Sequence, residues 1–324
     1  MTLPLLRRTF VAAAAALLTA GMAPDAHAQI GGLGGALGRA AHHVNLGSLT
    51  SGPQPISTSL GDARWAVDSL DSFTPREAKR SLMTLRRTPN GGFVLQPGYY
   101  ELHDQSYCLH AGTHGPGGGD GYIFAPPKGT AEDAVMSVVR NSVQHPNIDQ
   151  HDVQLLLWAI VARAKFEDLD TRLQQVASQL LTPRQLATLN RSALDLVPGA
   201  ALNSAMDRVP PLVRQVLQSE AQLRQMLTTP GTPYEQMERV AVLAGVPALG
   251  AGSRAVPSGR WSLHPDGYYI RYLPYSYTNT VVQVWVPQGS PAVGREYDPA
   301  THIAVPGNTA RQRLIQSGRP YNQS

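Results

Sequence analysis

The sequence has a single cysteine, Cys108, among its 324 residues. One cysteine excludes an internal disulfide. This is unusual for a chain that starts with an export signal, because exported proteins normally use cysteines in pairs. Cys108 is therefore a small buried hydrophobe, a free thiol, half of an intermolecular bridge or a reactive group. The sequence alone leaves these four alternatives open.

Lysine is also scarce, because only Lys79, Lys128 and Lys165 stand among the 27 basic residues. The formal net charge is +4, but arginines and lysines form no dense run. Nucleic-acid binding requires a clustered basic stripe, so we expect no nucleic-acid partner. No later apolar stretch reaches the roughly 20 residues that cross a bilayer as a helix. We therefore expect no stable membrane insertion.

The first 28 residues have the three parts of a secretory signal. Arg7 and Arg8 form the charged start, residues 10–18 a short apolar core and residues 26–28 a small-residue cleavage site. The paired arginines also resemble a twin-arginine export signal, which carries folded chains. The sequence predicts a secreted or periplasmic protein after cleavage near Ala28-Gln29.

Composition divides the rest of the chain. We expect an α+β protein whose central domain mixes strands and helices, includes a helical segment and is followed by a small C-terminal β module. The predicted parts are a signal peptide at 1–28, a flexible Gly/Ala/Ser/Pro-rich leader at 29–60, an α+β domain at 61–245, a Pro/Gly/Ala linker at 246–257 and the C-terminal β module with its tail at 258–324.

Periodicity assigns elements within these parts. Thr130 is expected to cap one helix and Asp149 the next, which is apolar nearly all round and therefore central to the domain. Residues beyond Pro306 are polar and expected to be loosely held. The predicted strands are 92–95, 99–102, a strand carrying Cys108, 122–125, 260–263, 267–272 and 280–286, and the later predicted helices are 184–194, 209–227 and 234–243.

Two segments of the central region resemble the thioester domains of bacterial surface adhesins. Tyr107-Cys108-Leu109 in a strand is followed by a Pro/Gly loop and a helix, and then by a helix in which Gln154 stands four residues before Trp158. The resemblance covers residues 92–165. The family usually has threonine before the glutamine, where this chain has Val153.

The resemblance implies a defined chemistry for the pair. The Cys108 thiol attacks the side-chain amide carbon of Gln154, ammonia leaves, and the resulting thioester is opened by a target amine such as a lysine. Because the thiolate is the attacking form, a base is needed, and His110 is the candidate for proton transfer, with His103 and His114 as alternatives. The residues expected to shield the thioester from water are Tyr107, Tyr122 and Trp158.

A second hypothesis is a non-catalytic envelope or secreted protein that binds polysaccharide. Aromatic residues gather in the C-terminal strands, and an exposed row of them would stack on sugar rings. The possible glycan-binding residues are Trp261, Tyr268 and Tyr272. In this hypothesis Cys108 is buried and inert.

A third hypothesis is a thiol hydrolase with Cys108 as nucleophile and His151 or His264 as base. A metal site formed by His110 and His114 is a weaker alternative, because the surrounding glycines and prolines do not favour a helix. We favour a non-enzymatic function without metal or cofactor. The predicted partner is an amine-bearing surface molecule or a polysaccharide.

Overall fold

The computed structural model describes residues 54–65, 70–71, 73–117, 119–194 and 209–322. The predicted signal peptide and most of the predicted leader lie outside these residues. Helices and strands both contribute to the described part of the chain, which confirms the α+β prediction. The helices are α3 (Glu132–Gln144), α4 (Gln150–Val161), α5 (Thr171–Leu180), α6 (Pro183–Arg191), α8 (Pro211–Leu227) and α9 (Tyr234–Ala241).

The strands form one large sheet and two small ones. The large sheet contains β1 (Lys79–Ser81), β3 (Gly98–Cys108), β5 (Tyr122–Ala125), β7 (Ser262–Leu263), β8 (Tyr269–Pro274), β9 (Asn279–Val286), β11 (Ile303–Pro306) and β12 (Leu314–Pro320). The small sheets pair β2 (Phe93–Val94) with β10 (Glu296–Tyr297) and β4 (Thr113–His114) with β6 (Val242–Leu243).

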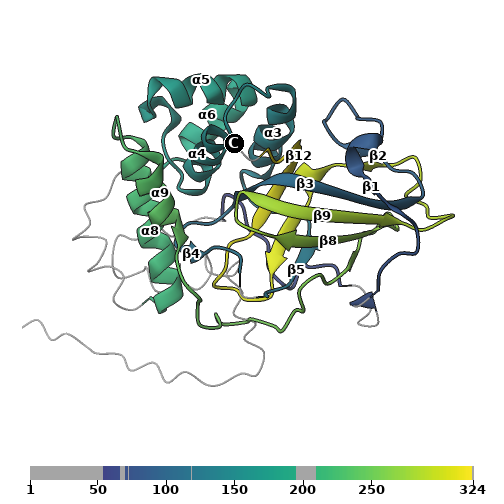
Figure 1. Ribbon diagram of the computed structural model, residues 1–324. Coiled ribbons are helices and arrows are strands. Elements are labelled where there is room, and N and C mark those ends of the chain that lie inside the picture. The colour runs from purple at the N-terminus through teal and green to yellow at the C-terminus, as the bar shows by residue number, and fades with distance from the viewer. Residues whose placement is uncertain (1–53, 66–69, 72, 118, 195–208, 323–324) are drawn as a thin grey trace, which may run out of the picture.

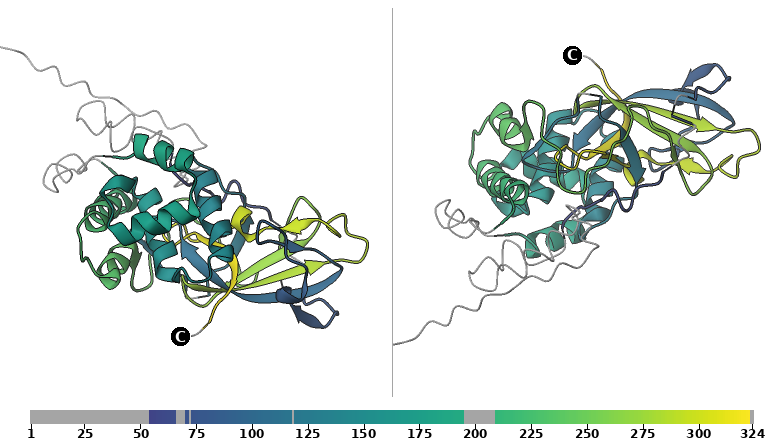
Figure 2. Two further views of the ribbon diagram at one scale, coloured as in Figure 1. Left: turned by 90° about the horizontal axis from the view of Figure 1, so that it is seen from above. Right: turned by 90° about the horizontal axis from the view of Figure 1, so that it is seen from below.

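Six strands of the large sheet close into an antiparallel barrel. The order is β3, β12, β11, β5, β8 and β9, and β9 pairs again with β3. Closure leaves the barrel without a free edge along most of its circumference. The helices gather on one side of the barrel in Figure 1, and both views of Figure 2 show the same two-part arrangement.

Strand β3 is longer than the sequence indicates, because the two predicted strands at 99–102 and around Cys108 are one element. The polar residues between them, His103 to Ser106, hide this continuity. The Asp104 carboxylate is buried and accepts the Gly318 N–H at 2.9 and 3.1 Å, where the pairing of β12 is irregular. Polar residues in a strand are stable there because the neighbouring strand supplies their partners.

Helix α4 is the central helix, as predicted. Nine of its twelve residues are buried, and it contacts α3, α5, α8 and β3. The Asp149 side chain accepts the His151 N–H at 2.7 Å, which confirms the predicted cap. The prediction that Thr130 caps α3 is wrong, since Ala131 occupies the N-cap position and makes no side-chain capping bond.

The C-terminal strands do not form a module of their own. Strands β8, β9, β11 and β12 supply four of the six barrel strands, and they share one core with β3 and β5. The expectation of a loosely held tail is also wrong, because Leu314 and Ile315 are fully buried. The predicted linker is part of the same body, since the Gly121 N–H donates to the Val256 carbonyl.

In the part of the chain that the structure describes, no helix has both the length and the apolar character needed to cross a membrane.

Candidate functional site

Cys108 is the last residue of β3 and is completely buried. On one side it lies opposite Leu314 of β12. On the other side the pairing of β3 with β9 stops at Gln105, which lies opposite Asn279. The backbone N–H and carbonyl of Cys108 therefore face a place where no strand continues.

The side chain of Gln154 occupies that place. The Cys108 N–H donates to Gln154 Oε1 at 2.8 Å, and Gln154 Nε2 donates to the Cys108 carbonyl at 3.1 Å. Both residues are buried. The carboxamide thus pairs with the strand as a peptide group would, and its carbonyl carbon lies directly beside the residue that carries the thiol.

One turn earlier on α4, Gln150 makes a related contact. Its Nε2 donates to the Ser106 carbonyl at 3.2 Å and to the Thr278 carbonyl at 2.8 Å. Residues four apart lie on the same face of a helix, so both glutamines point at the open edge of β3. Gln150 has no cysteine beside it and serves as a natural reference for Gln154.

Burial raises the pKa of the Cys108 thiol well above its ordinary value, and the negative charge of Glu238 raises it further. Burial therefore favours the thiol over the thiolate at this position. A poorly acidic thiol is also a poor leaving group, so a thioester on this sulfur would resist weak nucleophiles such as water.

The three predicted shielding residues are all buried, but only two of them lie on the side of Cys108 and Gln154. Trp158 follows Gln154 by one turn on α4, and Tyr122 is close enough for its phenol to interact electrostatically with Cys108. Tyr107 points to the opposite face of β3, because successive strand residues alternate. Tyr122 and Trp158 are thus placed to exclude water from the sulfur, and Tyr107 is not.

Two further aromatic residues, Tyr234 and Tyr277, lie near the Cys108–Gln154 pair and were not predicted from the sequence. Tyr234 opens α9, and its ring stacks on His151 and Trp158 with centroid distances of 4.0 and 5.7 Å. Tyr277 lies in the loop between β8 and β9, and its carbonyl accepts the Ser106 hydroxyl at 2.9 Å. An aromatic residue among the polar residues of a tight hairpin loop was the only sequence signal for Tyr277.

The loop after Cys108 holds α9 in this position. Gly112 has φ +69, which favours glycine, and a Cβ there would meet Ser219 of α8. Its N–H donates to the Ala241 carbonyl at the end of α9, and its carbonyl accepts Gln215 Nε2 at 2.7 Å. The parallel pairing of β4 with β6, which follows α9 directly, adds a second connection between this loop and α9.

His110 is not suited to the proton-transfer role that the sequence suggested. It is buried, and burial together with the charge of Arg313 lowers its pKa well below the ordinary value. The Arg313 guanidinium donates to its Nε2, so the nitrogen that would accept a proton is already occupied.

The glycan-binding prediction is wrong for all three of its residues. Trp261, Tyr268 and Tyr272 are exposed by 0, 0 and 1%, so no sugar reaches them. Tyr268 and Tyr272 face the core, and the Tyr268 hydroxyl bonds to His302 Nε2 at 2.5 Å.

The structure does not assemble the thiol hydrolase. No histidine forms a hydrogen bond with the Cys108 thiol in the described ranges, and His264 stacks instead on Phe124 and Tyr268. His151 stacks on Tyr234. The described residues also contain no group of three His, Cys, Asp or Glu side chains that would hold a metal ion.

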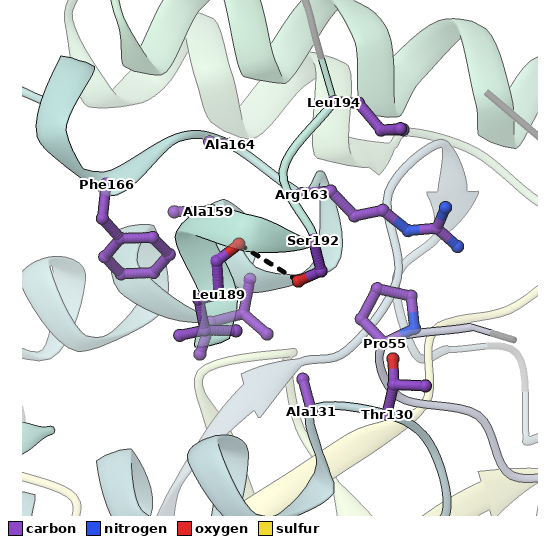
Figure 3. Close-up of a pocket in the computed structure, with 11 residues that line it drawn as sticks. Pro55, Thr130, Ala131, Ala159, Arg163, Ala164, Phe166, Leu189, Ser192 and Leu194 are labelled. Carbon is purple, nitrogen blue, oxygen red and sulfur yellow. Dashed lines mark hydrogen bonds between the residues drawn. The ribbon is translucent and has the colours of Figure 1, made fainter. Parts of the chain in front are cut away.

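A cavity of about 230 Å³ lies beyond the C-terminal end of α4 (Figure 3). Apolar side chains such as Ala159 and Leu189 line it, with Arg163 at its side. The Ser192 hydroxyl bonds back to the Leu189 carbonyl at 3.1 Å. The cavity shares no residue with the Cys108–Gln154 pair.

No family model, no curated protein and no solved structure matches this chain.

Proposed function

We propose that this protein attaches covalently to primary amines through an internal thioester between Cys108 and Gln154. The observation that carries the proposal is the double hydrogen bond between the Gln154 carboxamide and the backbone of Cys108. It holds the carboxamide against the backbone of the residue that carries the only thiol in the chain.

These contacts favour thioester formation. When the sulfur attacks the carboxamide carbon, negative charge develops on Oε1, and the Cys108 N–H is placed to stabilise it as an oxyanion-hole donor does. The C–S bond forms as the thiol proton passes to Nε2, the C–N bond breaks, and the nitrogen leaves as neutral ammonia. The hydrogen bond from Nε2 to the Cys108 carbonyl orients the nitrogen that departs.

The surroundings favour survival of the product. Trp158 and Tyr122 are buried beside the pair, and water that does not reach the acyl carbon cannot hydrolyse it. Opening then requires a nucleophile stronger than water, and amines meet this requirement at neutral pH.

The scarcity of lysine supports the same proposal. An electrophile aimed at amines would be consumed by lysines of its own chain or of neighbouring copies. Each of the three lysines pairs with a carboxylate: Lys79 with Glu101, Lys128 with Asp62 and Lys165 with Glu167. Arginine, which supplies the remaining basic residues, stays protonated and is a poor nucleophile.

The N-terminal segment supports a role outside the cytoplasm, where a covalent attachment to surface amines would serve adhesion. The proposed partner is a protein or other surface molecule that bears primary amines. The burial of Trp261 and Tyr268 removes the residues on which polysaccharide binding was predicted.

Methylamine tests the proposal directly. After incubation of the purified protein with methylamine, peptide mapping is expected to find N-methylglutamine at position 154. Cys108 is expected to become a free thiol that is alkylated once the protein is unfolded. Recovery of an unmodified glutamine at 154 after prolonged incubation would refute the proposed function.

A further inference from the structure

Three side chains form a hydrogen-bonded chain next to Cys108. The hydroxyls of Tyr234 and Tyr277 are 3.0 Å apart, and the Tyr277 hydroxyl donates to Glu238 Oε1. Tyr234 and Glu238 are one turn apart on α9, and Tyr277 comes from the loop between β8 and β9. All three are half-buried, so the chain links the protein surface to the interior.

Tyr234 lies beside the part of α4 that carries Gln154, and its phenol is close enough to Cys108 to interact with it electrostatically. The rings on which it stacks, His151 and Trp158, stand three residues before and four residues after Gln154 on α4. Positions with these spacings share one face of a helix, so the Tyr234 ring covers the face of α4 that includes Gln154 and Leu155.

Tyr277 and Glu238 lie beside the same site, Tyr277 in the loop between β8 and β9 and Glu238 on α9 with Tyr234. The Tyr277 carbonyl accepts the hydroxyl of Ser106, two residues before Cys108 on β3. The carboxylate of Glu238 is close enough to raise the pKa of the Cys108 thiol. A carboxylate and two phenol rings therefore lie together on this side of the Cys108–Gln154 pair.

A carboxylate beside aromatic rings selects one chemical class of nucleophile. At neutral pH an alkylamine is a cation, which a carboxylate attracts and which the faces of phenol rings stabilise further. The same cation must lose a proton before its nitrogen attacks. Neither water nor another neutral nucleophile is attracted by the carboxylate in this way.

We propose that Glu238, Tyr234 and Tyr277 form the entrance through which alkylammonium groups, such as lysine side chains, reach the thioester. The proposal rests on the function proposed above. Glu238 binds the ammonium and takes one proton from it, and Tyr277 positions the carboxylate.

The transfer balances as follows. The neutral nitrogen attacks the acyl carbon of residue 154, the C–N bond forms and the C–S bond breaks. The second proton of the nitrogen passes to the Cys108 sulfur, where burial favours the thiol over the thiolate. Glu238 then releases its proton to solvent.

The test compares Glu238→Gln with the wild-type protein after intact mass has shown that both have lost one ammonia. With methylamine, which is cationic, we expect Glu238→Gln to react at least about tenfold more slowly than the wild type. This is the lower end of what the loss of a general base costs. With hydroxylamine, which is neutral at neutral pH, we expect the two proteins to react at equal rates.

Two further variants complete the comparison. Tyr277→Phe removes the hydroxyl that bonds to Glu238. This variant is expected to react more slowly with methylamine but at the wild-type rate with hydroxylamine. Glu235→Gln changes the same charge on the exposed side of α9 and is expected to react as the wild type does.

The outcomes separate this inference from the proposed function. If the wild-type protein itself has lost no ammonia, the thioester proposal fails. If Glu238→Gln carries the thioester and reacts with methylamine at the wild-type rate, only the entrance is refuted. If Glu238→Gln alone lacks the thioester, Glu238 acts in bond formation, and its assignment to amine entry is wrong.

Discussion

Replacement of Gln154 by glutamate is expected to leave the chain at its full sequence mass and to abolish the incorporation of methylamine. Glutamate has the same shape, so its Oε1 can still accept the Cys108 N–H. Its second oxygen would have to leave as hydroxide or water instead of ammonia. No thioester therefore forms spontaneously.

The fold should tolerate this substitution at a moderate cost. At this buried position the carboxyl group is expected to bind a proton rather than remain charged, and the substitution also disturbs the hydrogen bond that Nε2 donates to the Cys108 carbonyl. An unsatisfied buried acceptor costs about 1–3 kcal/mol. Thermal unfolding should therefore stay cooperative, with a lower midpoint.

Gln150→Glu is the matched control for this variant. It makes the same chemical change one turn earlier on α4, against the Ser106 carbonyl and without a thiol beside it. We expect Gln150→Glu to lose ammonia and to incorporate methylamine as the wild type does. Incorporation of methylamine by Gln154→Glu would contradict the assignment of Gln154.

A chain that ends at Pro257 is expected not to fold. It would lack β8, β9, β11 and β12, which are four of the six barrel strands. The long strand β3 would keep only β1 as a partner, and its buried N–H and carbonyl groups would face water. Since a domain is stable by only about 5–15 kcal/mol, the loss of most of its sheet exceeds the whole margin.

Soluble expression, near-ultraviolet circular dichroism and thermal unfolding measure this effect. The truncated chain is expected to be insoluble or to unfold without a cooperative transition, whereas the full-length chain shows a single transition. A fragment ending at Pro257 that melts cooperatively would restore the division into a central domain and a C-terminal module.

Local patterns in the sequence predicted most elements of this fold. The broad apolar face of α4 marked a central helix, Asp149 marked its start, and residues 122–125 were predicted as the strand that the structure contains. Each of these signals depends on residues within about one turn or one strand of each other.

The arrangement of the strands could not be predicted in this way. Cys108 of β3 lies opposite Leu314 of β12, and Gly98 lies opposite Val286 of β9. Nothing local marks partners so far apart in the chain. The Pro/Gly/Ala composition of 246–257 indicated a boundary, but such residues also suit a segment that crosses the barrel end, as Val256 does beside Gly121.

The proximity of Cys108 and Gln154 was anticipated only through the family resemblance. The entrance was not anticipated, because it depends on the docking of α9 through Gly112 and on the hairpin that carries Tyr277. The role given to His110 failed because its partner, Arg313, is about two hundred residues distant in the chain, a separation that sequence spacing does not reveal.

The intact mass of the purified wild-type protein, measured after unfolding in mild acid without amine or reductant, tests the central claim most directly. We expect a mass lower than that of the sequence by one ammonia, and a Cys108→Ala protein at its full sequence mass. A wild-type protein at full sequence mass, with a thiol that is alkylated on unfolding, would contradict it.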